Sequence, residues 1–205
     1  MVGESIQSLS KLRNRYFAMR HGQSEANAAG LIVSQAQNGV PGYGLTAFGR
    51  HQVETGVSAS ALDATVRILS SDFKRARDSA EIAHSLLGCD KPVTFDTRLR
   101  ERNFGDLELG PDARYAEVWT MDGLDAGVSE QGVESVASIL QRALAVVIDC
   151  EQQFNDESCL LVAHGDILQI LQTAFYRMPA NRHRDLAHLQ TAEVRALKLQ
   201  LASNR

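Results

Sequence analysis

The feature that most limits the fold of this chain is the near-continuous apolar run SCLLVAHG, at residues 158–165. A strand with one solvated face alternates apolar and polar residues, so an unbroken apolar run indicates a strand that is covered on both faces. Strands of this kind occur in parallel sheets, where helical connections lie on both sides. The run therefore predicts an α/β protein with its sheet between two helical layers.

The rest of the chain alternates between strand-like and helix-like segments. Short segments rich in apolar residues predict further strands at residues 15–19, 66–72, 92–99 and 192–199. Helical spacing of apolar residues predicts helices over residues 46–62, 74–88, 133–154 and 166–178. Thr46 is the expected N-cap of the first of these helices, and Gly88 is the expected end of the second. This order predicts a three-layer αβα sandwich with a mostly parallel central sheet.

Three other segments complete the expected organisation of the chain. Residues 1–14 are polar and predict a flexible N-terminal tail, followed by a single domain over residues 15–205. The segment 24–44 contains several Gly and one Pro, which favours a surface loop. Residues 115–132 fit no single element, and the variable segment 106–131 is a candidate lid.

Composition limits the partners of the chain. The 25 acidic residues exceed the 21 Lys and Arg, and no segment forms a basic stripe, so neither nucleic acid nor a membrane is an expected partner. The strongly apolar stretch 159–163 is far shorter than the ~20 residues of a membrane span, and the N-terminal segment lacks the apolar core of a secretory signal. The 3 cysteines are widely spaced and suit reduced thiols. Together these features predict a cytoplasmic protein.

Polar residues follow three of the expected strands at the point where each strand ends. The first strand runs into Arg20, His21 and Gly22, the second into a polar segment just before Arg75, and the run at 158–165 ends in His164. In open α/β sheets, ligands bind beyond the carboxyl ends of the strands. We therefore expect the two histidines to meet at one edge of the sheet.

These residue types meet the requirements of phosphoryl transfer through a covalent intermediate. A neutral imidazole offers a free lone pair near pH 7, because the unperturbed pKa of histidine is ~6.5. Arginine donates two parallel hydrogen bonds to phosphate oxygens and keeps its charge. A carboxyl group can protonate the leaving oxygen if its pKa is raised, as a nearby phosphate would raise it.

Four segments in order, RHGQSEAN, SSDFKRARDSA, LRERNFGDLELG and LLVAHGD, carry a more specific signal. They resemble the signature of the histidine phosphatase superfamily, also called the phosphoglycerate mutase-like superfamily. The similarity spans residues 16 to about 199. RHG alone is frequent by chance, whereas four blocks in the correct order are not. The resemblance implies a phosphoglycerate mutase-like fold, a phosphohistidine intermediate, and no metal or organic cofactor.

The resemblance also implies roles for individual residues. His21 would be the phosphorylated nucleophile, Glu101 the proton donor, and His164 the histidine that stabilises the transition state. The phosphate- or substrate-binding residues would be Arg20, Asn27, Arg75 and Gly165. Arg75 fits the family pattern because the small hydroxyl residue Ser79 follows it four positions later.

Several activities stay open at this point. The shortness of the segment between residues 105 and 131, compared with cofactor-dependent mutases, favours a phosphatase that acts on a small phosphorylated substrate or on a phosphoprotein. A phosphoglycerate mutase is the alternative among enzymes. A module that binds phosphorylated ligands without catalysis is the alternative from another class. The natural substrate and the oligomeric state do not follow from the sequence.

Two carboxylates close to the expected phosphate site would oppose anion binding. They are Asp78 and Asp166, and we expect Asp166 to cap its own helix and Asp78 to pair with Arg75 or Arg77. Otherwise Arg77 is expected on the solvated face of its helix.

Other conspicuous side chains have simpler explanations. Four further histidines are expected at the surface or in helix packing: His51, His84, His183 and His188. None of them has the HExxH spacing of a metal site. Tyr115, Trp119 and Met121 either line a lid over the pocket or cover the edge of the sheet.

Overall fold

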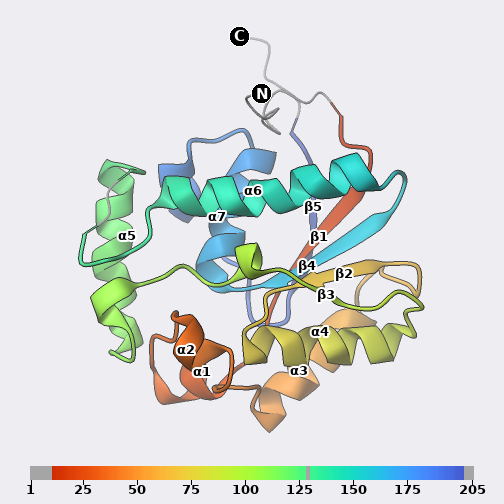
Figure 1. The fold of residues 1–205 in the computed structure, drawn as a ribbon, viewed down its shortest axis with the longest axis horizontal. Helices are drawn as coiled ribbons and strands as arrows, with labels where there is room; N and C mark the ends of the chain where they lie inside the picture. Colours follow the sequence, from red (N-terminus) through yellow and green to blue (C-terminus); the bar gives the residue numbers. More distant parts are fainter. Residues whose placement is uncertain (1–10, 128–129, 201–205) are drawn as a thin grey trace.

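The computed structural model describes residues 11–127 and 130–200, which form a twisted five-stranded sheet flanked by helices (Figure 1). The strand order is β3-β2-β4-β1-β5. The strands are β1 (Arg15–Arg20), β2 (Arg67–Ser70), β3 (Thr94–Phe95), β4 (Ser158–Ala163) and β5 (Val194–Leu197). Neighbouring strands are parallel except for β5, which pairs antiparallel with β1. The mostly parallel sheet confirms the fold class expected from the sequence.

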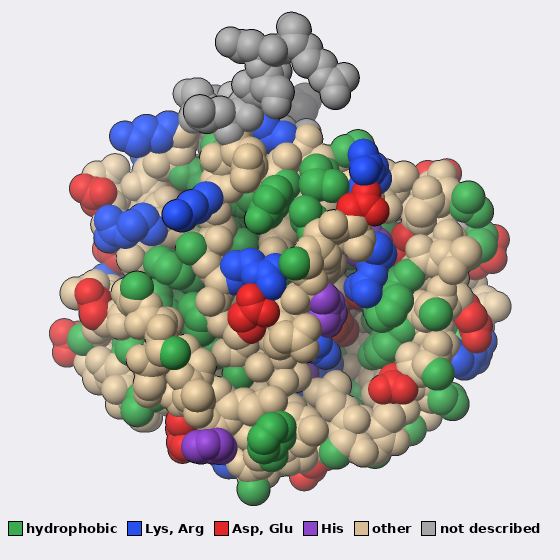
Figure 2. All heavy atoms as spheres, turned by 180° about the vertical axis from the view of Figure 1, so that it is seen from behind, with side chains coloured by type: hydrophobic (Ala, Val, Ile, Leu, Met, Phe, Trp, Pro, Cys, Tyr) green, Lys and Arg blue, Asp and Glu red, His purple; other side chains and the backbone are tan. Residues whose placement is uncertain are grey.

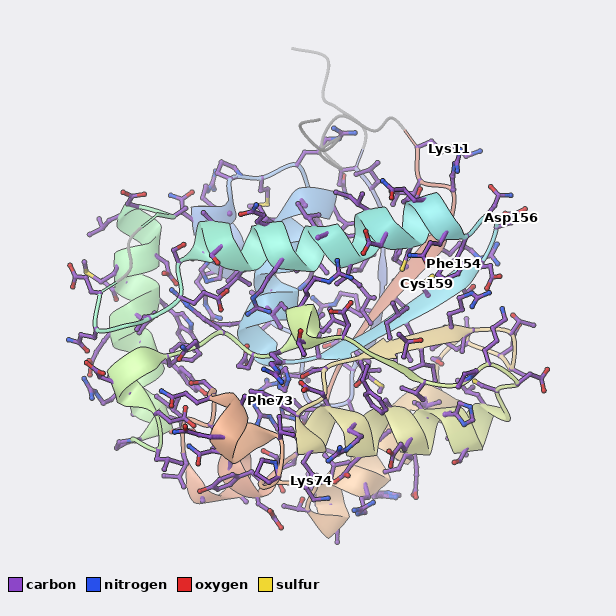
Figure 3. All side chains as sticks on the ribbon, viewed as in Figure 1. Lys11, Phe73, Lys74, Phe154, Asp156 and Cys159 are labelled. Carbon is purple, nitrogen blue, oxygen red and sulfur yellow. The ribbon has the colours of Figure 1, made fainter. Side chains whose placement is uncertain are left out.

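Strand β4 lies at the centre of the sheet and is buried on both faces, as its apolar run predicts. Cys159 and Leu161 belong to one hydrophobic cluster, whereas Leu160 and Val162 belong to the other. Successive side chains of a strand point to opposite faces, so each face of β4 supports one half of the core. Figure 3 labels Cys159 near the start of this strand, at the end of the sheet remote from α5 (Tyr115–Leu124).

Two pairs of helices cover the two faces of the sheet and complete the three layers (Figure 1). Helices α6 (Val136–Gln153) and α7 (Gly165–Phe175) share one hydrophobic cluster with the sheet. Helices α3 (Ala47–Ser58) and α4 (Lys74–Leu87) share the other. The side chain of Thr46 accepts a hydrogen bond from Gly49 N–H and caps α3, as expected. Gly88 ends α4 in the left-handed conformation, with φ 62°.

The connections contain more regular structure than the sequence pattern predicts. The expected loop 24–44 holds two short helices, α1 (Glu25–Ala29) and α2 (Ala36–Gly39). Helix α1 forms because Ser24 and Asn27 make a reciprocal capping box at its start. Short 3₁₀ helices lie at η2 (Thr97–Leu99), η3 (Gly105–Leu107), η4 (Asp112–Arg114) and η5 (Ala180–Asp185), the last with a kink at Arg182.

The expected third strand at 92–99 is only two residues long. It stops at Phe95 because the side chain of Asp96 accepts a hydrogen bond from Arg98 N–H and starts η2. The segment 115–132, which fits no element by pattern, contains α5 at one end of the molecule (Figure 1).

The expected tail is shorter than residues 1–14. Residues 1–10 lie outside the described residues, whereas Asn14 is only 5% exposed and its backbone and side chain both donate hydrogen bonds to Glu151 of α6. The single domain and the lid role of residues 106–131 stay predictions. Within the described ranges, no helix combines the length and the apolar character needed to cross a lipid bilayer.

Candidate active site

The carboxyl ends of β1, β2 and β4 bring sequence-distant residues together. His21 N–H donates to the Ala163 carbonyl at 3.0 Å, so His21 follows β1 directly beside the end of β4. The rings of His21 and His164 have their centroids 5.1 Å apart. The two histidines thus share one site, as expected from their positions after parallel strands.

The hydrogen bonds of His21 define its tautomer. Nδ1 lies 2.7 Å from the Gly22 carbonyl oxygen, which can only accept, so Nδ1 carries the proton. Nε2 in turn accepts a hydrogen bond from Arg75 Nε at 3.1 Å. Burial, reinforced by Arg75 and Arg20, holds the pKa of His21 well below its usual value. His21 is therefore a neutral imidazole with a lone pair on Nε2.

Gly22 permits the close packing that holds His21 in place. A Cβ atom at Gly22 would lie 2.2 Å from the Gly49 carbonyl oxygen of α3, so no larger residue fits. Gly22 N–H also donates to the Ser79 hydroxyl of α4 at 3.2 Å. The two helices on this face of the sheet therefore both fix the backbone next to His21.

Two arginines lie beside the histidines, and both keep unused donors. Arg75 donates through Nη2 to the Val33 carbonyl at 2.8 Å, and Arg20 donates through Nη1 to His188 Nε2 at 2.8 Å. Arg20 Nε and Arg75 Nη1 are buried and have no hydrogen-bond partner in the described part of the chain. Unpaired buried donors are costly, so these atoms favour a site for an oxyanion.

His164 is fixed by two neighbours from the start of α4. Its Nε2 lies 2.9 Å from the Ser71 hydroxyl, and its ring packs edge-on against Phe73 with centroids 5.2 Å apart. Figure 3 labels Phe73 at this end of α4, beside α2. Nδ1 of His164 is buried without a partner among the described residues, and burial holds its pKa well below the usual value.

Glu101 provides the carboxyl group of the site. Its Oε1 accepts hydrogen bonds from Arg102 N–H at 2.9 Å and from Ile167 N–H at 3.4 Å. Burial raises the pKa of Glu101, and the nearby carboxylate of Asp166 raises it further, against the opposing charge of Arg75. This environment favours the protonated form that a proton donor needs.

Asn27 and Gly165, which the sequence predicts to bind phosphate or substrate, also line the pocket. The side-chain oxygen of Asn27 accepts from Ser24 N–H at 3.1 Å and from its hydroxyl at 3.0 Å. This pairing leaves the amide NH₂ of Asn27 as the donor available to a ligand. Gly165 begins α7, whose N-terminal end favours negative charge.

These side chains surround one pocket with an empty volume of about 680 Å³. Six of the seven residues predicted for the site line it, and the ring of the seventh, His164, packs edge-on against the His21 ring. Figure 2 shows a hollow on this face of the molecule, to the right of centre, bordered by histidine and basic side chains. In the described part of the chain, no three His, Cys, Asp or Glu side chains are grouped so that they could hold a metal ion.

His188 lines the pocket, although the sequence favours a surface or packing role for it over a place at the rim of the substrate site. Because Arg20 donates to His188 Nε2, that nitrogen is unprotonated. Burial and Arg20 lower the pKa of His188 to about 4, so it is neutral at pH 7. The segment RHRDLAHL, with its two histidines, is the only sequence signal for it; no periodicity places the segment beside Arg20.

Asp78 and Asp166, the two carboxylates expected near the phosphate site, have other partners than the sequence predicts. Asp78 pairs with Lys74 at 3.3 Å and Arg50 at 3.7 Å, and not with Arg75 or Arg77. Arg77 instead donates to the Val40 carbonyl at 3.3 Å.

Asp166 does not cap its own helix. It accepts hydrogen bonds from Trp119 Nε1 at 3.0 Å and from Arg102 Nη1 at 3.4 Å. Arg102 also makes a two-fold hydrogen bond to Asp122 of α5, at 2.6 and 2.8 Å. This buried network ties α5 to the residue after Glu101 and to the start of α7.

Of the three aromatic or thioether side chains proposed for a lid, two face the pocket. Tyr115 and Trp119 line it, whereas Met121 lines a smaller hollow on another side of α5. The rings of Tyr115 and Trp119 stack with centroids 5.5 Å apart.

Comparison with known proteins agrees with this geometry. The sequence model of the histidine phosphatase superfamily (branch 1) matches residues 16–204. A probable phosphoglycerate mutase from Salmonella arizonae is 34% identical over 177 residues, which cover 83% of this chain and 78% of that protein. A glucosyl-3-phosphoglycerate phosphatase from Mycolicibacterium vanbaalenii is 31% identical over 180 residues, covering 82% and 76% respectively.

Solved structures share the fold. Bacillus stearothermophilus YhfR superposes with a TM-score of 0.75 at 23% identity, covering 93% of this chain and 96% of that one. A mycobacterial glucosyl-3-phosphoglycerate phosphatase superposes with a TM-score of 0.73 at 24% identity, covering 91% and 90%. The match of the superfamily model over nearly all of the sequence shows that the chain belongs to the histidine phosphatase superfamily, branch 1.

Proposed function

We propose that this protein is a phosphomonoesterase that works through a phosphohistidine intermediate. The observation that carries the proposal is the neutral Nε2 of His21, which lies beside three buried nitrogens without partners in the described residues: Arg20 Nε, Arg75 Nη1 and His164 Nδ1. A phosphoryl group would give these nitrogens oxygen partners and would meet the lone pair of His21.

In the first step, His21 Nε2 attacks phosphorus in line with the ester oxygen. The N–P bond forms as the P–O ester bond breaks, and Glu101 gives its proton to the departing alkoxide. Arg20, Arg75 and His164 would hold the phosphoryl oxygens, with Asn27 as a further donor. The raised pKa of Glu101 keeps the proton available for this step.

In the second step, water attacks the phosphohistidine. The carboxylate of Glu101 accepts a proton from the water, the N–P bond breaks, and inorganic phosphate leaves. Glu101 is then protonated again and His21 is neutral, so the cycle closes.

A phosphoglycerate mutase is the second candidate, because one group of relatives carries that name. A mutase would return the phosphoryl group to another hydroxyl of the sugar acid instead of to water. With 3-phosphoglycerate, released phosphate indicates a phosphatase, and the 2-phospho isomer without release indicates a mutase. A module that only binds phosphate would give neither product and no covalent intermediate.

The proposal is tested by trapping the intermediate. Brief exposure to radiolabelled substrate, followed by alkaline denaturation, should leave label on the protein that acid removes. His21→Ala should abolish both labelling and turnover, because it removes the proposed nucleophile beside Arg75. His51→Ala is the matched control, because His51 is exposed on α3, lies 3.7 Å from Glu54 and does not line the pocket. Full turnover by His21→Ala would overturn the mechanism.

A further inference from the structure

The charges that line the pocket are unevenly distributed. Arg20 and Arg75 are the only lysine or arginine residues among the described residues of its wall. Both lie beside His21, where they are needed for the phosphoryl group. We call the site formed by Arg20, His21, Arg75 and His164 the inner end of the pocket. Beyond it, the leaving part of a substrate meets no cationic side chain of the described wall.

Asp112 is a carboxylate on the outer wall. It is the first residue of η4, and its backbone N–H donates to the Gly30 carbonyl at 2.9 Å, which fixes it beside the end of α1. Its side chain is exposed and forms no ion pair with any described residue. Asp112 therefore presents an uncompensated negative charge to whatever enters the pocket.

Asp166 adds a second carboxylate to the wall, although a partly neutralised one. Arg102 and the Trp119 indole donate to it, and Arg184 Nη1 lies 3.9 Å away. Arg184 itself lies over the face of the Trp119 ring, 3.8 Å from its centroid, and does not line the pocket. Arg184 is therefore held by the indole and by Asp166, whose negative charge offsets its own, and its side chain is not part of the wall.

Most of the remaining outer wall is apolar or aromatic, and its other polar side chains, Ser24, Asn27 and His188, carry no positive charge. The stacked rings of Tyr115 and Trp119 form one side. Four smaller or apolar contributions complete it: Ala26, Leu31, Val33 and Phe104. Such a surface suits the CH groups of an alcohol or sugar, and it leaves a charged group without a partner. We call Leu31, Asp112, Tyr115 and Trp119 the mouth of the pocket.

We infer that the leaving group of the substrate is an uncharged alcohol, such as a polyol or sugar, and that substrates with a carboxylate close to the ester are disfavoured. The inference rests on the proposed phosphatase function and adds its substrate class. A substrate carboxylate at the mouth would be repelled by Asp112, and it would lose hydration without forming an ion pair with a cationic side chain of the wall.

Two compounds with the same three-carbon skeleton test the inference. Glycerol 3-phosphate ends in a neutral CH₂OH where 3-phosphoglycerate ends in a carboxylate. We expect kcat/KM for glycerol 3-phosphate to be at least about tenfold higher, since like charges in a recognition site are discriminated against. Turnover of 3-phosphoglycerate is counted as released phosphate plus any 2-phospho isomer. Equal values, or a preference for 3-phosphoglycerate, would overturn the inference.

Asp112→Asn should raise kcat/KM for 3-phosphoglycerate several-fold, while kcat/KM for glycerol 3-phosphate changes little, so the ratio of the two values should fall. Higher ionic strength should lower this ratio in the wild-type protein and not in the variant, because an exposed charge is screened by salt. Glu54→Gln, which removes an exposed carboxylate of α3 outside the pocket, is the control and should leave the ratio unchanged.

p-Nitrophenyl phosphate separates this inference from the proposed function. If the protein hydrolyses p-nitrophenyl phosphate but shows no preference between glycerol 3-phosphate and 3-phosphoglycerate, the proposed phosphatase function stands and the inferred substrate class is wrong. If no ester is turned over, the binding of glycerol 3-phosphate and 3-phosphoglycerate is measured by calorimetry. Binding of 3-phosphoglycerate as tight as that of glycerol 3-phosphate then overturns the inference.

Discussion

The inner end of the pocket and its mouth are built from different kinds of structure. His21, Arg75 and His164 follow or adjoin parallel strands and are at most 4% exposed. Asp112, Tyr115 and Trp119 belong to η4 and α5, in the long connection between β3 and α6. The difference teaches that the sheet positions the groups proposed for chemistry, while a connection provides the groups proposed for selectivity.

Their electrostatics differ in the same way. Burial lowers the pKa of both histidines of the inner end, and it raises that of Glu101 in the adjoining wall, so the protonation states of these three groups depend on the fold. Charge at the mouth is exposed and is screened by salt. Substitutions at the inner end should therefore change kcat for all substrates, whereas those at the mouth should change the choice among substrates.

The largest effect after loss of His21 is expected for Arg75→Lys. Lysine keeps the charge but cannot donate to His21, to Val33 and to a phosphoryl oxygen from one planar group. We expect kcat/KM to fall roughly 10²–10³-fold for every ester, as for loss of a preorganised donor to transition-state charge. Arg77→Lys, two positions along the same helix, is the control in steady-state assays. A substrate-dependent loss would break the assignment of Arg75 to the inner end.

Glu101→Gln should have a smaller effect that depends on the leaving group. We expect roughly a 10²-fold loss for alkyl phosphates and much less for p-nitrophenyl phosphate, whose leaving oxygen needs no proton donor. Equal losses for both would contradict the acid role.

The pH profile sharpens this test. Burial raises the pKa of Glu101, so the carboxyl group stays protonated at pH values where an exposed glutamate is ionised. Turnover of an alkyl phosphate should fall as pH rises through that raised pKa, because the proton is lost. Glu101→Gln should lack this alkaline decline.

Trp119→Phe probes the mouth. Phenylalanine can still stack on Tyr115 but cannot donate to Asp166, so the carboxylate loses one hydrogen-bond donor beside the pocket. We expect KM to rise only several-fold for glycerol 3-phosphate, with kcat nearly constant, because the lost hydrogen bond to Asp166 involves no residue of the inner end. A fall in kcat equal to that of Glu101→Gln would show that the two regions are not separable.

The smallest effect is expected for Ser24→Ala. It removes the cap of α1 and one partner of Asn27, which should lower the free energy of unfolding by about 1 kcal/mol. Urea denaturation measures this change. Ser85→Ala, at an exposed position of α4, is the control and should stay within about 0.5 kcal/mol of wild type.

The sequence predicts the inner end well because the signal there is local. An apolar run that ends in His164, and a strand that ends in Arg20 and His21, place these residues at one sheet edge by the geometry of parallel strands alone. The bond of Arg75 to His21 then needs only the helix after β2.

The mouth is predicted poorly because tertiary contacts fix it. Helix α5 has no clear amphipathic pattern; the buried pair Arg102–Asp122 and the bond of Trp119 to Asp166 hold it. His188 meets Arg20 only because β5 pairs antiparallel with β1 and brings the preceding segment back to the site. No spacing along the chain reports such long-range pairings.

The Arg102–Asp122 pair has a consequence for exchanging parts between relatives. If residues 106–131 are replaced by a relative's segment that lacks a carboxylate at position 122, the buried guanidinium of Arg102, next to Glu101 in the chain, loses its closest ion-pair partner. Chimeras that keep this carboxylate should tolerate varied loops, whereas those that drop it should fail even when their new mouth fits the intended ester.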